Sequence, residues 1–372
     1  MPNFDWKDRR VFVTGHTGFK GGWLCLWLQL MGARVHGYAH VPPTRQNLYE
    51  LADIDSGIES TIGDVRDLAA LEAAIDAARP EVVFHLAAQP IVQFGYQDPV
   101  GTIATNVMGT AHVLDAARRR PEIKALVIVT SDKCYANHEW HWGYREKSQL
   151  GGRDPYAASK SCAEILVHAF RESYFSGPAD EPHALVASVR AGNVIGGGDW
   201  APHRLVPDIV ATLREDRPLV LRHPEAIRPW QHVLEPLRGY LQVAERLYTG
   251  DTKVAAAWNF GPVDEDCLPV SWLAGQLTRK WGREVQWELD RIPRPHEDTF
   301  LKLDCGKARA MLGWAPVLRL ADGLDWIVEW YRELDRGADM RQATLDQIRR
   351  YRQLASELSD PSLNAAIGVR SA

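Results

Sequence analysis

The stretch VFVTGHTGFKGGWLCLWL, residues 11 to 28, decides the fold class. A short β-branched run precedes three glycines at GxxGxxG spacing, and an apolar run with the length of a helix follows them. Such glycines let the backbone turn tightly and approach a pyrophosphate, which lies on the amide groups and positive dipole of the helix N-terminus. A triple glycine alone could be a structural turn, but the strand before it and the helix after it favour dinucleotide binding. The residues expected to hold the dinucleotide are Gly15, His16, Thr17, Gly18, Phe19, Lys20 and Gly21.

Further short apolar or β-branched runs predict more strands, and helical patterns separate them. After Asp67, a plausible N-cap, apolar residues recur at helical spacing, and they do so again from Ile103 to Leu114. This alternation predicts a doubly wound α/β fold, in which helices cover a parallel sheet. The predicted strands are residues 11–14, 34–38, 81–87, 125–130 and 185–190, with a third short strand ending near Asp64.

The regular alternation of predicted strands and helices ends after residue 190, where NVIGGGDWAPHR and further loops follow. We expect a Rossmann-type dinucleotide-binding domain over residues 1–190, with its sheet completed by segments near 225–262, where WNFGP at 258–262 is typical of a strand end. Residues 191–345 then form a smaller mixed α/β substrate-binding lobe, including helices at 234–248 and 323–334. Residues 346–372 are predicted to be a weakly patterned tail.

The amino-acid composition of the chain argues against some kinds of binding partner. The 372 residues include 43 Lys and Arg against 48 Asp and Glu, a net charge of −5, so no broad basic field is offered to nucleic acid or an anionic membrane. Five cysteines, none spaced as CxxC, argue against a disulfide framework and against a zinc site. The polar N-terminus and the lack of a long apolar run favour a cytoplasmic protein with a small-molecule partner and no metal.

The acid that would hold an adenosine ribose, about 20 residues after the glycine loop, is missing. No acidic residue lies between Gly32 and Glu50, so this test cannot separate NAD from NADP, and Thr44 or Arg45 could take part in either case. Asp64 is a candidate for the adenine amine; a helix-capping turn acid is the alternative. Other residues expected along the cofactor are Val65, Leu86, Ala87, Ala88, Gln89 and Asn106.

Tyr156 and Lys160 form a YxxxK pair after Pro155, a good first residue for a helix. Positions i and i+4 share a helix face, so the Lys160 ammonium can approach the phenol. A phenol with a pKa near 10 becomes a usable base at neutral pH only beside positive charge. An exposed helix pair is the alternative interpretation.

Ser131, Asp132 and Lys133 follow a predicted buried strand, and ligands of open α/β sheets bind beyond the carboxyl ends of strands. Hydride transfer at one carbon would need only Tyr156 and a hydroxyl such as Ser131. The additional acid and base suggest a second reaction on the oxidised substrate. A polar turn with an incidental ion pair is the alternative.

A GxxGxxG loop followed about 140 residues later by YxxxK resembles the extended branch of the short-chain dehydrogenase/reductase superfamily, over roughly residues 8–335. The resemblance implies that Tyr156 is the catalytic base for a sugar hydroxyl and that Lys160 bridges to the nicotinamide ribose. Together with the strand-end triplet Ser131, Asp132 and Lys133, the resemblance points to nucleotide-sugar 4,6-dehydratases. These enzymes use bound NAD to oxidise C4, eliminate water across C5 and C6, and return the hydride to C6.

Thymidine-type dehydratases carry Thr-Asp-Glu at this strand end. Ser131, Asp132 and Lys133 depart from that pattern and are similar to the CDP-sugar branch, which implies CDP-D-glucose as substrate, Asp132 as the acid and Lys133 as the C5 base. A lysine must be neutral to act as a base, so burial or Lys160 would have to depress its pKa.

The resemblance also implies the residues that bind the nucleotide sugar. Gln89 and Tyr96 are expected near the sugar, Asn106 behind the active site, and Asn193 and Arg228 at the diphosphate. Tyr96 could instead be a core residue and Arg228 a surface residue. The remaining expected contacts are Arg204 to a phosphate or the base, and His296 and Glu297 to the nucleotide ribose.

Two other functions stay open at this point. A nucleotide-sugar 4-epimerase, or a 4,6-dehydratase acting on a dTDP, UDP or GDP sugar, would use the same Tyr156 and Lys160, but the epimerase would not need Asp132 and Lys133. A redox sensor or scaffold could lose the tyrosine or the acid. A homodimer or homotetramer is expected through helices near 100–118 and 156–173, whose apolar faces could equally be core. The product would feed deoxysugars of a bacterial surface polysaccharide such as the lipopolysaccharide O-antigen.

Overall fold

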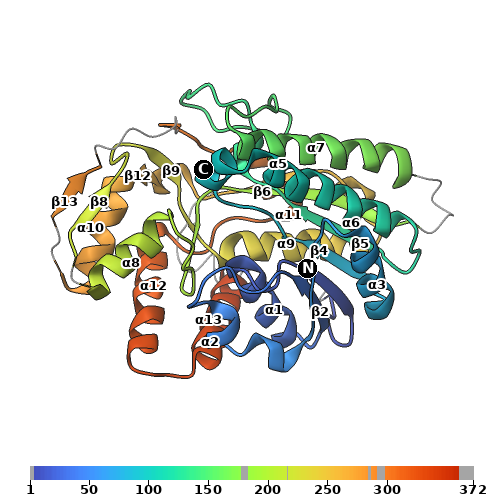
Figure 1. Cartoon of the computed structure of the whole chain (residues 1–372), viewed down its shortest axis with the longest axis horizontal. Coiled ribbons are helices and arrows are strands. Elements are labelled where there is room, and N and C mark those ends of the chain that lie inside the picture. The colour runs from blue at the N-terminus through green and yellow to red at the C-terminus, as the bar shows by residue number, and fades with distance from the viewer. Residues whose placement is uncertain (1–3, 177–182, 216, 284–285, 291–297, 360–372) are drawn as a thin grey trace.

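The computed structural model describes residues 4–176, 183–215, 217–283, 286–290 and 298–359. A parallel sheet of seven strands forms its centre, in the order β11-β6-β5-β4-β1-β2-β3 (Figure 1). The predicted doubly wound fold is confirmed, and the WNFGP segment supplies the edge strand β11. The strands are β1 (Arg10–Thr14), β2 (Arg34–Ala39), β3 (Glu59–Ile62), β4 (Val82–His85), β5 (Ala125–Val129), β6 (Leu185–Ala191) and β11 (Ala257–Phe260).

Helices cover both faces of this sheet. Those on or near the sheet are α1 (Phe19–Leu30), α3 (Leu68–Ala78), α6 (Gly109–Arg118), α7 (Pro155–Tyr174) and α9 (Leu234–Tyr248). Shorter helices lie in the connections: α2 (Leu48–Leu51), α4 (Val92–Gln97), α5 (Pro99–Ile103) and α11 (Gly306–Leu312). A π-helical turn, Ala104–Met108, joins α5 to α6.

The two faces of the sheet carry two separate hydrophobic cores. Side chains alternate along each strand, so Val11 and Val13 of β1 pack with α1 and α9, whereas Phe12 packs with α3, α6 and α7. Asp67 caps α3 as predicted, since its carboxylate accepts the N–H of Ala70 at 3.0 Å. The helix at 234–248 was predicted in the second lobe. That placement is wrong, because its apolar face covers β5 and β6.

A smaller lobe follows the sheet, built from short strand pairs and helices. In it α10 packs against α8 and α12. Its elements are α8 (Leu205–Glu215), α10 (Val270–Trp281), α12 (Leu320–Asp335) and the pairs β7 (Val194–Ile195) with β10 (Gln231–His232), β8 (Leu219–Leu221) with β13 (Trp287–Leu289), and β9 (Ile227–Pro229) with β12 (Cys267–Pro269).

The last described element is α13 (Met340–Ser359), which packs against α1 and α12. The tail predicted from residue 346 is therefore wrong up to residue 359. Few apolar residues mark this helix, but Ile348 and Tyr351 are fully buried, and the Tyr351 hydroxyl donates to the buried Glu235 carboxylate at 2.7 Å. Residues 360–372 lie outside the described residues.

Within the described ranges, none of the helices combines the length and the apolar character that a membrane span requires.

Candidate functional site

The glycine loop lies between β1 and α1, where the sequence predicts it. Gly15 has φ +80°, and a Cβ there would lie 2.7 Å from the backbone N of Ala87; a Cβ on Gly21 would lie 2.0 Å from the Gly15 carbonyl oxygen. Gly18 is the N-cap of α1 and has no side-chain cap. The loop therefore packs backbone on backbone, and its open helix N-terminus fits a pyrophosphate.

His16 and Thr17 fix the loop to the second strand. The His16 ring is fully buried above Gly37, where a Cβ would meet it at 2.3 Å, and its Nε2 lies 2.8 Å from the Ser60 hydroxyl. Burial lowers the pKa of His16 to about 4, so the ring is neutral at physiological pH. Thr17 donates to the His40 carbonyl at 2.9 Å. Both side chains thus hold the loop in place.

Asp64 lies just beyond β3, and its carboxylate is engaged locally. It accepts the backbone N–H of Arg66 at 2.8 Å, pairs with the Arg66 guanidinium, and lies 3.3 Å from Nε2 of His40. The hydrogen bond from Arg66 is the main cause of its lowered pKa. These local contacts are typical of an acid in a turn, which was the alternative interpretation of Asp64. Val65 beside it is buried. Thr44 donates to the Gln46 carbonyl nearby.

Hydrogen bonds from backbone N–H groups and from the Gln89 side chain hold the loop after β4 in place. The backbone N–H groups of Leu86 and Ala87 both donate to the Thr14 hydroxyl at 3.1 Å. The Gln89 side chain donates to the Thr102 hydroxyl and accepts from the N–H of Ile91, so both ends of its amide are bonded within the loop.

Asn106 lies behind the site, as expected. It accepts from the backbone of Gln89 at 2.8 Å and donates to the Ser159 hydroxyl at 2.8 Å, and it is almost fully buried. It thereby ties the π-helical turn and the β4 loop to α7.

Tyr156 and Lys160 lie on the first turns of α7, which begins at Pro155 and is capped by the Asp154 carboxylate. Burial raises the pKa of Tyr156 to about 12, while the Ser131 hydroxyl and the charge of Arg204 oppose that rise. Burial also lowers the pKa of Lys160 to about 8, against the opposing charge of Glu164. Both side chains are buried, so the alternative of an exposed pair is wrong.

The strand-end triplet follows β5 directly. The Ser131 hydroxyl donates to Oδ1 of Asp132 at 3.0 Å. Burial raises the pKa of Asp132, although Lys133 and Ser131 oppose it. Its Oδ2 is buried without a hydrogen-bond partner in the part of the chain that the structure describes, and a Cβ on Gly192 would come within 2.9 Å of it. Lys133 reaches across to Asp298, with 2.5 Å between Nζ and Oδ2.

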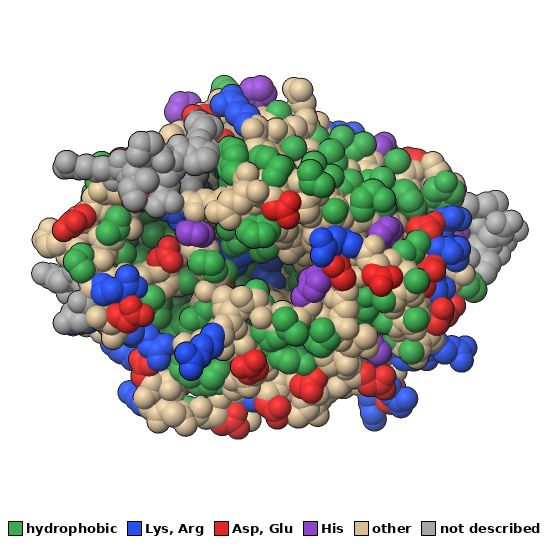
Figure 2. Space-filling model, in the orientation of Figure 1, with side chains coloured by type: hydrophobic (Ala, Val, Ile, Leu, Met, Phe, Trp, Pro, Cys, Tyr) green, Lys and Arg blue, Asp and Glu red, His purple; other side chains and the backbone are tan. Residues whose placement is uncertain are grey.

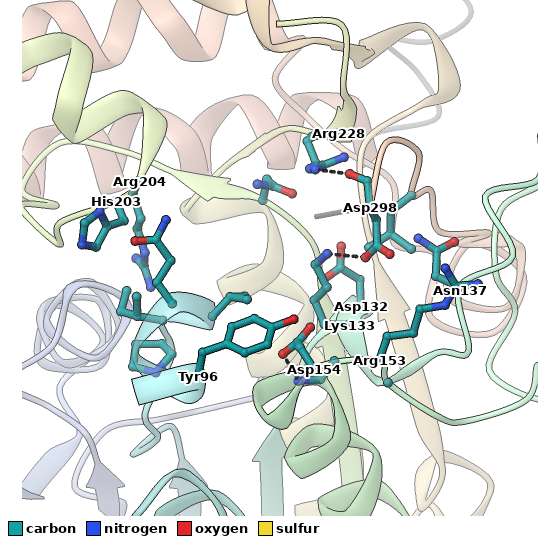
Figure 3. A pocket seen from close by; sticks show the side chains of 18 of the residues that line it. Tyr96, Asp132, Lys133, Asn137, Arg153, Asp154, His203, Arg204, Arg228 and Asp298 are labelled. Carbon is teal, nitrogen blue, oxygen red and sulfur yellow. Dashed lines mark hydrogen bonds and ion pairs between the residues drawn. The ribbon is translucent and has the colours of Figure 1, made fainter. Parts of the chain in front are cut away.

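Asp132 and Lys133 line a pocket of about 220 Å³ (Figure 3). Tyr96 from α4 lines one side, and Arg228 and Asp298 line the other. Cationic side chains outnumber acidic ones, which suits a substrate with a diphosphate. The cationic ones are Lys133, Arg153, Arg204, Arg222 and Arg228, against Asp132, Asp154 and Asp298.

The predicted substrate residues mostly reach this pocket. Tyr96, Asn193, Arg204 and Arg228 line it. Arg228 is buried, so the alternative of a surface residue is wrong; its guanidinium donates to the backbone carbonyls of Ile227 and Asp298. His296 and Glu297 lie outside the described residues.

Sequence reasoning missed several residues that line the pocket. Arg153 and Asp154 lie just before α7. Asp298 directly follows His296 and Glu297, which the sequence predicted to contact the ribose. Asp199, which accepts from Arg204 at 2.9 Å, was also missed. The only available signal was the position of these polar residues beside predicted site residues.

Comparisons with known proteins agree with this site. The family model for GDP-mannose 4,6 dehydratase matches residues 12–327. The chain is 50% identical over 347 residues to a CDP-glucose 4,6-dehydratase from Salmonella typhimurium, covering 93% of this chain and 97% of that protein. It is 25% identical over 332 residues to a dTDP-glucose 4,6-dehydratase from Xanthomonas campestris pv. campestris, covering 86% and 92%.

Solved structures share the architecture. A dTDP-glucose 4,6-dehydratase from Streptomyces venezuelae, solved with NAD bound, superposes with a TM-score of 0.73 at 26% identity, over 89% of this chain and 99% of that one. A UDP-glucose 4-epimerase from Thermotoga maritima gives a TM-score of 0.77 at 22% identity, over 87% and 99%, and shows the fold alone.

Proposed function

Because this chain belongs to the GDP-mannose 4,6-dehydratase family, we infer that it converts CDP-D-glucose to CDP-4-keto-6-deoxy-D-glucose and water with bound NAD. It is an NAD-dependent hydro-lyase. Asp132 is the residue that carries the chemical argument: it is a buried carboxyl with a raised pKa in the wall of the substrate pocket. An epimerase has no use for such an acid, because no hydroxyl leaves its substrate.

The glycine loop, Gly15 to Gly21, is where we propose the cofactor pyrophosphate lies. NAD, when bound, accepts the hydride from C4 and returns it to C6 of the sugar. Phe19 and Lys20 occupy the first turn of α1, beside the open amide groups. Burial, together with the nearby charges of Arg204 and Lys160, lowers the pKa of Lys20 to about 7, so an arriving phosphate would favour its charged form.

Tyr156 is the group that we propose accepts the proton of the C4 hydroxyl. A phenol with a pKa of about 12 is neutral at physiological pH, so it needs positive charge nearby before it can act. Lys160, one helical turn further along α7, and Arg204, which already lowers the pKa of Tyr156, are the cations that the chain itself provides. Ser131 hydrogen-bonds the phenol and orients it.

Asp132 is the group that we propose protonates the departing C6 hydroxyl. Once C4 is a ketone, the proton on C5 becomes acidic, and a base can remove it while the C6 oxygen leaves as water. The raised pKa of Asp132 keeps the proton on the carboxyl to a higher pH than usual, which an acid catalyst requires. The product at this stage is a C5–C6 double bond conjugated to the ketone.

Arg228 and Arg204, with Asn193, are the side chains that we propose hold the diphosphate and its nucleotide. Guanidinium groups can grip two phosphate oxygens at once. Tyr96, which lines the opposite wall, is the side chain that we propose contacts the sugar. His296 and Glu297 stay proposed contacts of the ribose.

A homodimer through α5, α6 and α7 is the assembly that we propose. Hydrophobic side chains gather over this surface in Figure 2, and the exposed ones are Val100, Ile103, Met108 and Ile165. The apolar face of the helix near 100–118 was expected either at a subunit contact or in the core, and the exposure of Ile103 favours the subunit contact. The five free cysteines support a cytoplasmic site of action.

The decisive experiment compares CDP-, UDP-, dTDP- and GDP-glucose, each incubated separately with the purified protein in D2O. We expect loss of one water from the CDP sugar, with solvent deuterium at C5, detected by mass spectrometry and NMR. Formation of a C4 epimer without water loss would instead make the protein an epimerase.

A further inference from the structure

We propose that Asp298 is the base that removes the C5 proton, and that Lys133 is a positioning residue that orients it. This inference rests on the dehydratase function given above and replaces the assignment of Lys133 as the base. It begins from an ion pair that joins two distant segments at the pocket wall.

Lys133 and Asp298 meet inside the pocket. Nζ of Lys133 lies 2.5 Å from Oδ2 of Asp298, and both side chains are largely buried, 20% and 13% exposed. Figure 3 shows the pair beside Asp132, with Arg228 reaching Asp298 from the other side. The backbone carbonyl of Asp298 accepts from the Arg228 guanidinium, which fixes the segment where its side chain can reach the sugar.

An ion pair at this distance favours the charged form of each partner. The Lys133 side chain of this ion pair donates its hydrogens to Asp298, and an ammonium has no lone pair with which to accept a proton. In this pair Asp298 is the partner that can accept a proton, since a carboxylate oxygen carries lone pairs.

Asp132 and Asp298 are tuned in opposite directions, as an acid and a base should be. Burial raises the pKa of Asp132. Burial also acts to raise the pKa of Asp298, but the charge and hydrogen bond of Lys133, with help from Asn137 and Arg228, outweigh it and leave that pKa lowered. The charge of Asp298 itself contributes to the rise at Asp132, so the two carboxyls are near neighbours.

The elimination balances with these two groups. The Asp298 carboxylate takes the C5 proton, the C5–H electron pair becomes the C5–C6 double bond, and the C6–O bond breaks as Asp132 gives its proton to the leaving oxygen. Water departs, Asp298 holds one proton, and Asp132 is left as a carboxylate. The carboxyl proton of Asp298 exchanges with solvent, and when the hydride arrives at C6, Asp298 gives a solvent-derived proton to C5. Lys133 stays an ammonium throughout and offsets the changing charge of Asp298.

The test compares isosteric variants of the holoenzyme mixed with CDP-D-glucose in D2O. Three readouts are followed: the absorbance of NADH, solvent deuterium at C5 in recovered sugar, and water loss. In Asp298→Asn we expect NADH to form while C5 exchange and water loss both fall at least about 100-fold, the usual scale for a lost general base. In Lys133→Met we expect C5 exchange to survive, at a rate at least about tenfold above that of Asp298→Asn.

If a variant loses other steps of the reaction as well, chemical rescue tests which residue removes the C5 proton. Formate should restore C5 exchange to Asp298→Ala and should leave Lys133→Ala unchanged. Retained C5 exchange in Asp298→Asn together with its loss in Lys133→Met would overturn the proposal, as would the absence of formate rescue. Wild-type enzyme that dehydrates no CDP-D-glucose would instead refute the proposed function, so the two failures are distinguishable.

Discussion

Glu164 and Arg190 form an ion pair of 2.6 Å between side chains that are 2% and 3% exposed. Glu164 lies on α7, one turn beyond Lys160, and Arg190 lies on β6, so the pair fastens the catalytic helix to the sheet. The Glu164 carboxylate also accepts from the Ser188 hydroxyl at 2.7 Å and from that of Thr130. Position and charge at Lys160 therefore depend on a contact that the substrate never touches.

Glu164→Gln should destabilise the fold by about 3–5 kcal/mol, because it leaves the buried Arg190 charge uncompensated. Burial tends to raise the pKa of Glu164, but Arg190 outweighs it and the pKa is lowered in the folded protein. The contribution is therefore complete above the ordinary pKa of glutamate, about 4.3, and disappears as the pH falls through the lowered value. Urea unfolding at several pH values measures this difference, and the exposed Glu172→Gln on the same helix should change stability by less than about 0.5 kcal/mol.

Tyr156→Phe should prevent even the first oxidation, because the C4 hydroxyl then has no proton acceptor. We expect the rate of NADH formation with CDP-D-glucose to fall by about 100-fold or more. Tyr174→Phe, at an exposed position at the end of the same helix, should keep the wild-type rate. Full NADH formation in Tyr156→Phe would end its assignment as the base.

Asp132→Asn should separate the two halves of the reaction. The amide cannot protonate the leaving C6 oxygen, so water loss should fall by about 100-fold or more, whereas oxidation at C4 should continue and NADH should accumulate. Mass spectrometry of the sugar and the NADH absorbance report the two halves. The exposed Asp264→Asn serves as the control, and unchanged dehydration in Asp132→Asn would remove Asp132 as the acid.

Gly21→Ala should weaken NAD binding, because its Cβ would lie 2.0 Å from the Gly15 carbonyl oxygen and the loop would have to move. Overpacking of this kind costs about 1–3 kcal/mol. Gly275→Ala is the matched control: it lies within α10 with no neighbouring atom within 4 Å of an added Cβ, and it should stabilise the helix by about 0.5–1 kcal/mol. Calorimetric titration with NAD and thermal unfolding measure both effects, and equal NAD affinity in the two variants would contradict the assignment of the loop.

Val100→Asp should shift the proposed dimer towards monomer, since it places a charge in the apolar surface of α5, where Val100 is 76% exposed. Light scattering coupled to size exclusion gives the mass. Val220→Asp, an exposed valine on β8 in the other lobe, should leave the mass unchanged. A wild-type monomer at micromolar concentration would refute the dimer.

Most of the sheet could be predicted from the sequence because its central strands β4, β5 and β6 are compact runs buried on both faces, and the distant edge strand at Ala257–Phe260 is mostly buried as well. Tyr156 and Lys160 could be predicted because a helix fixes the spacing of i and i+4. Local patterns of this kind need no knowledge of the tertiary structure.

Contacts between distant segments were the part that could not be predicted. Asp298 is 165 residues from Lys133, and no spacing rule relates them. The hydrogen bonds of the Gln89 amide to Thr102 and Ile91 within its loop could not be read from the sequence either. The carboxylate of Glu235, which accepts from Tyr351, likewise gave no sign in the sequence that α13 would cover it.

The Lys133–Asp298 ion pair has a consequence for how this enzyme can have diverged. Replacing Lys133 alone by the glutamate of the thymidine type would set two carboxylates against each other in a buried wall, where like charges strongly disfavour ionisation. A charge change at Lys133 therefore requires a compensating change at Asp298. A lineage that exchanges the strand-end lysine for glutamate must also change the segment that contacts it, 165 residues later in the chain.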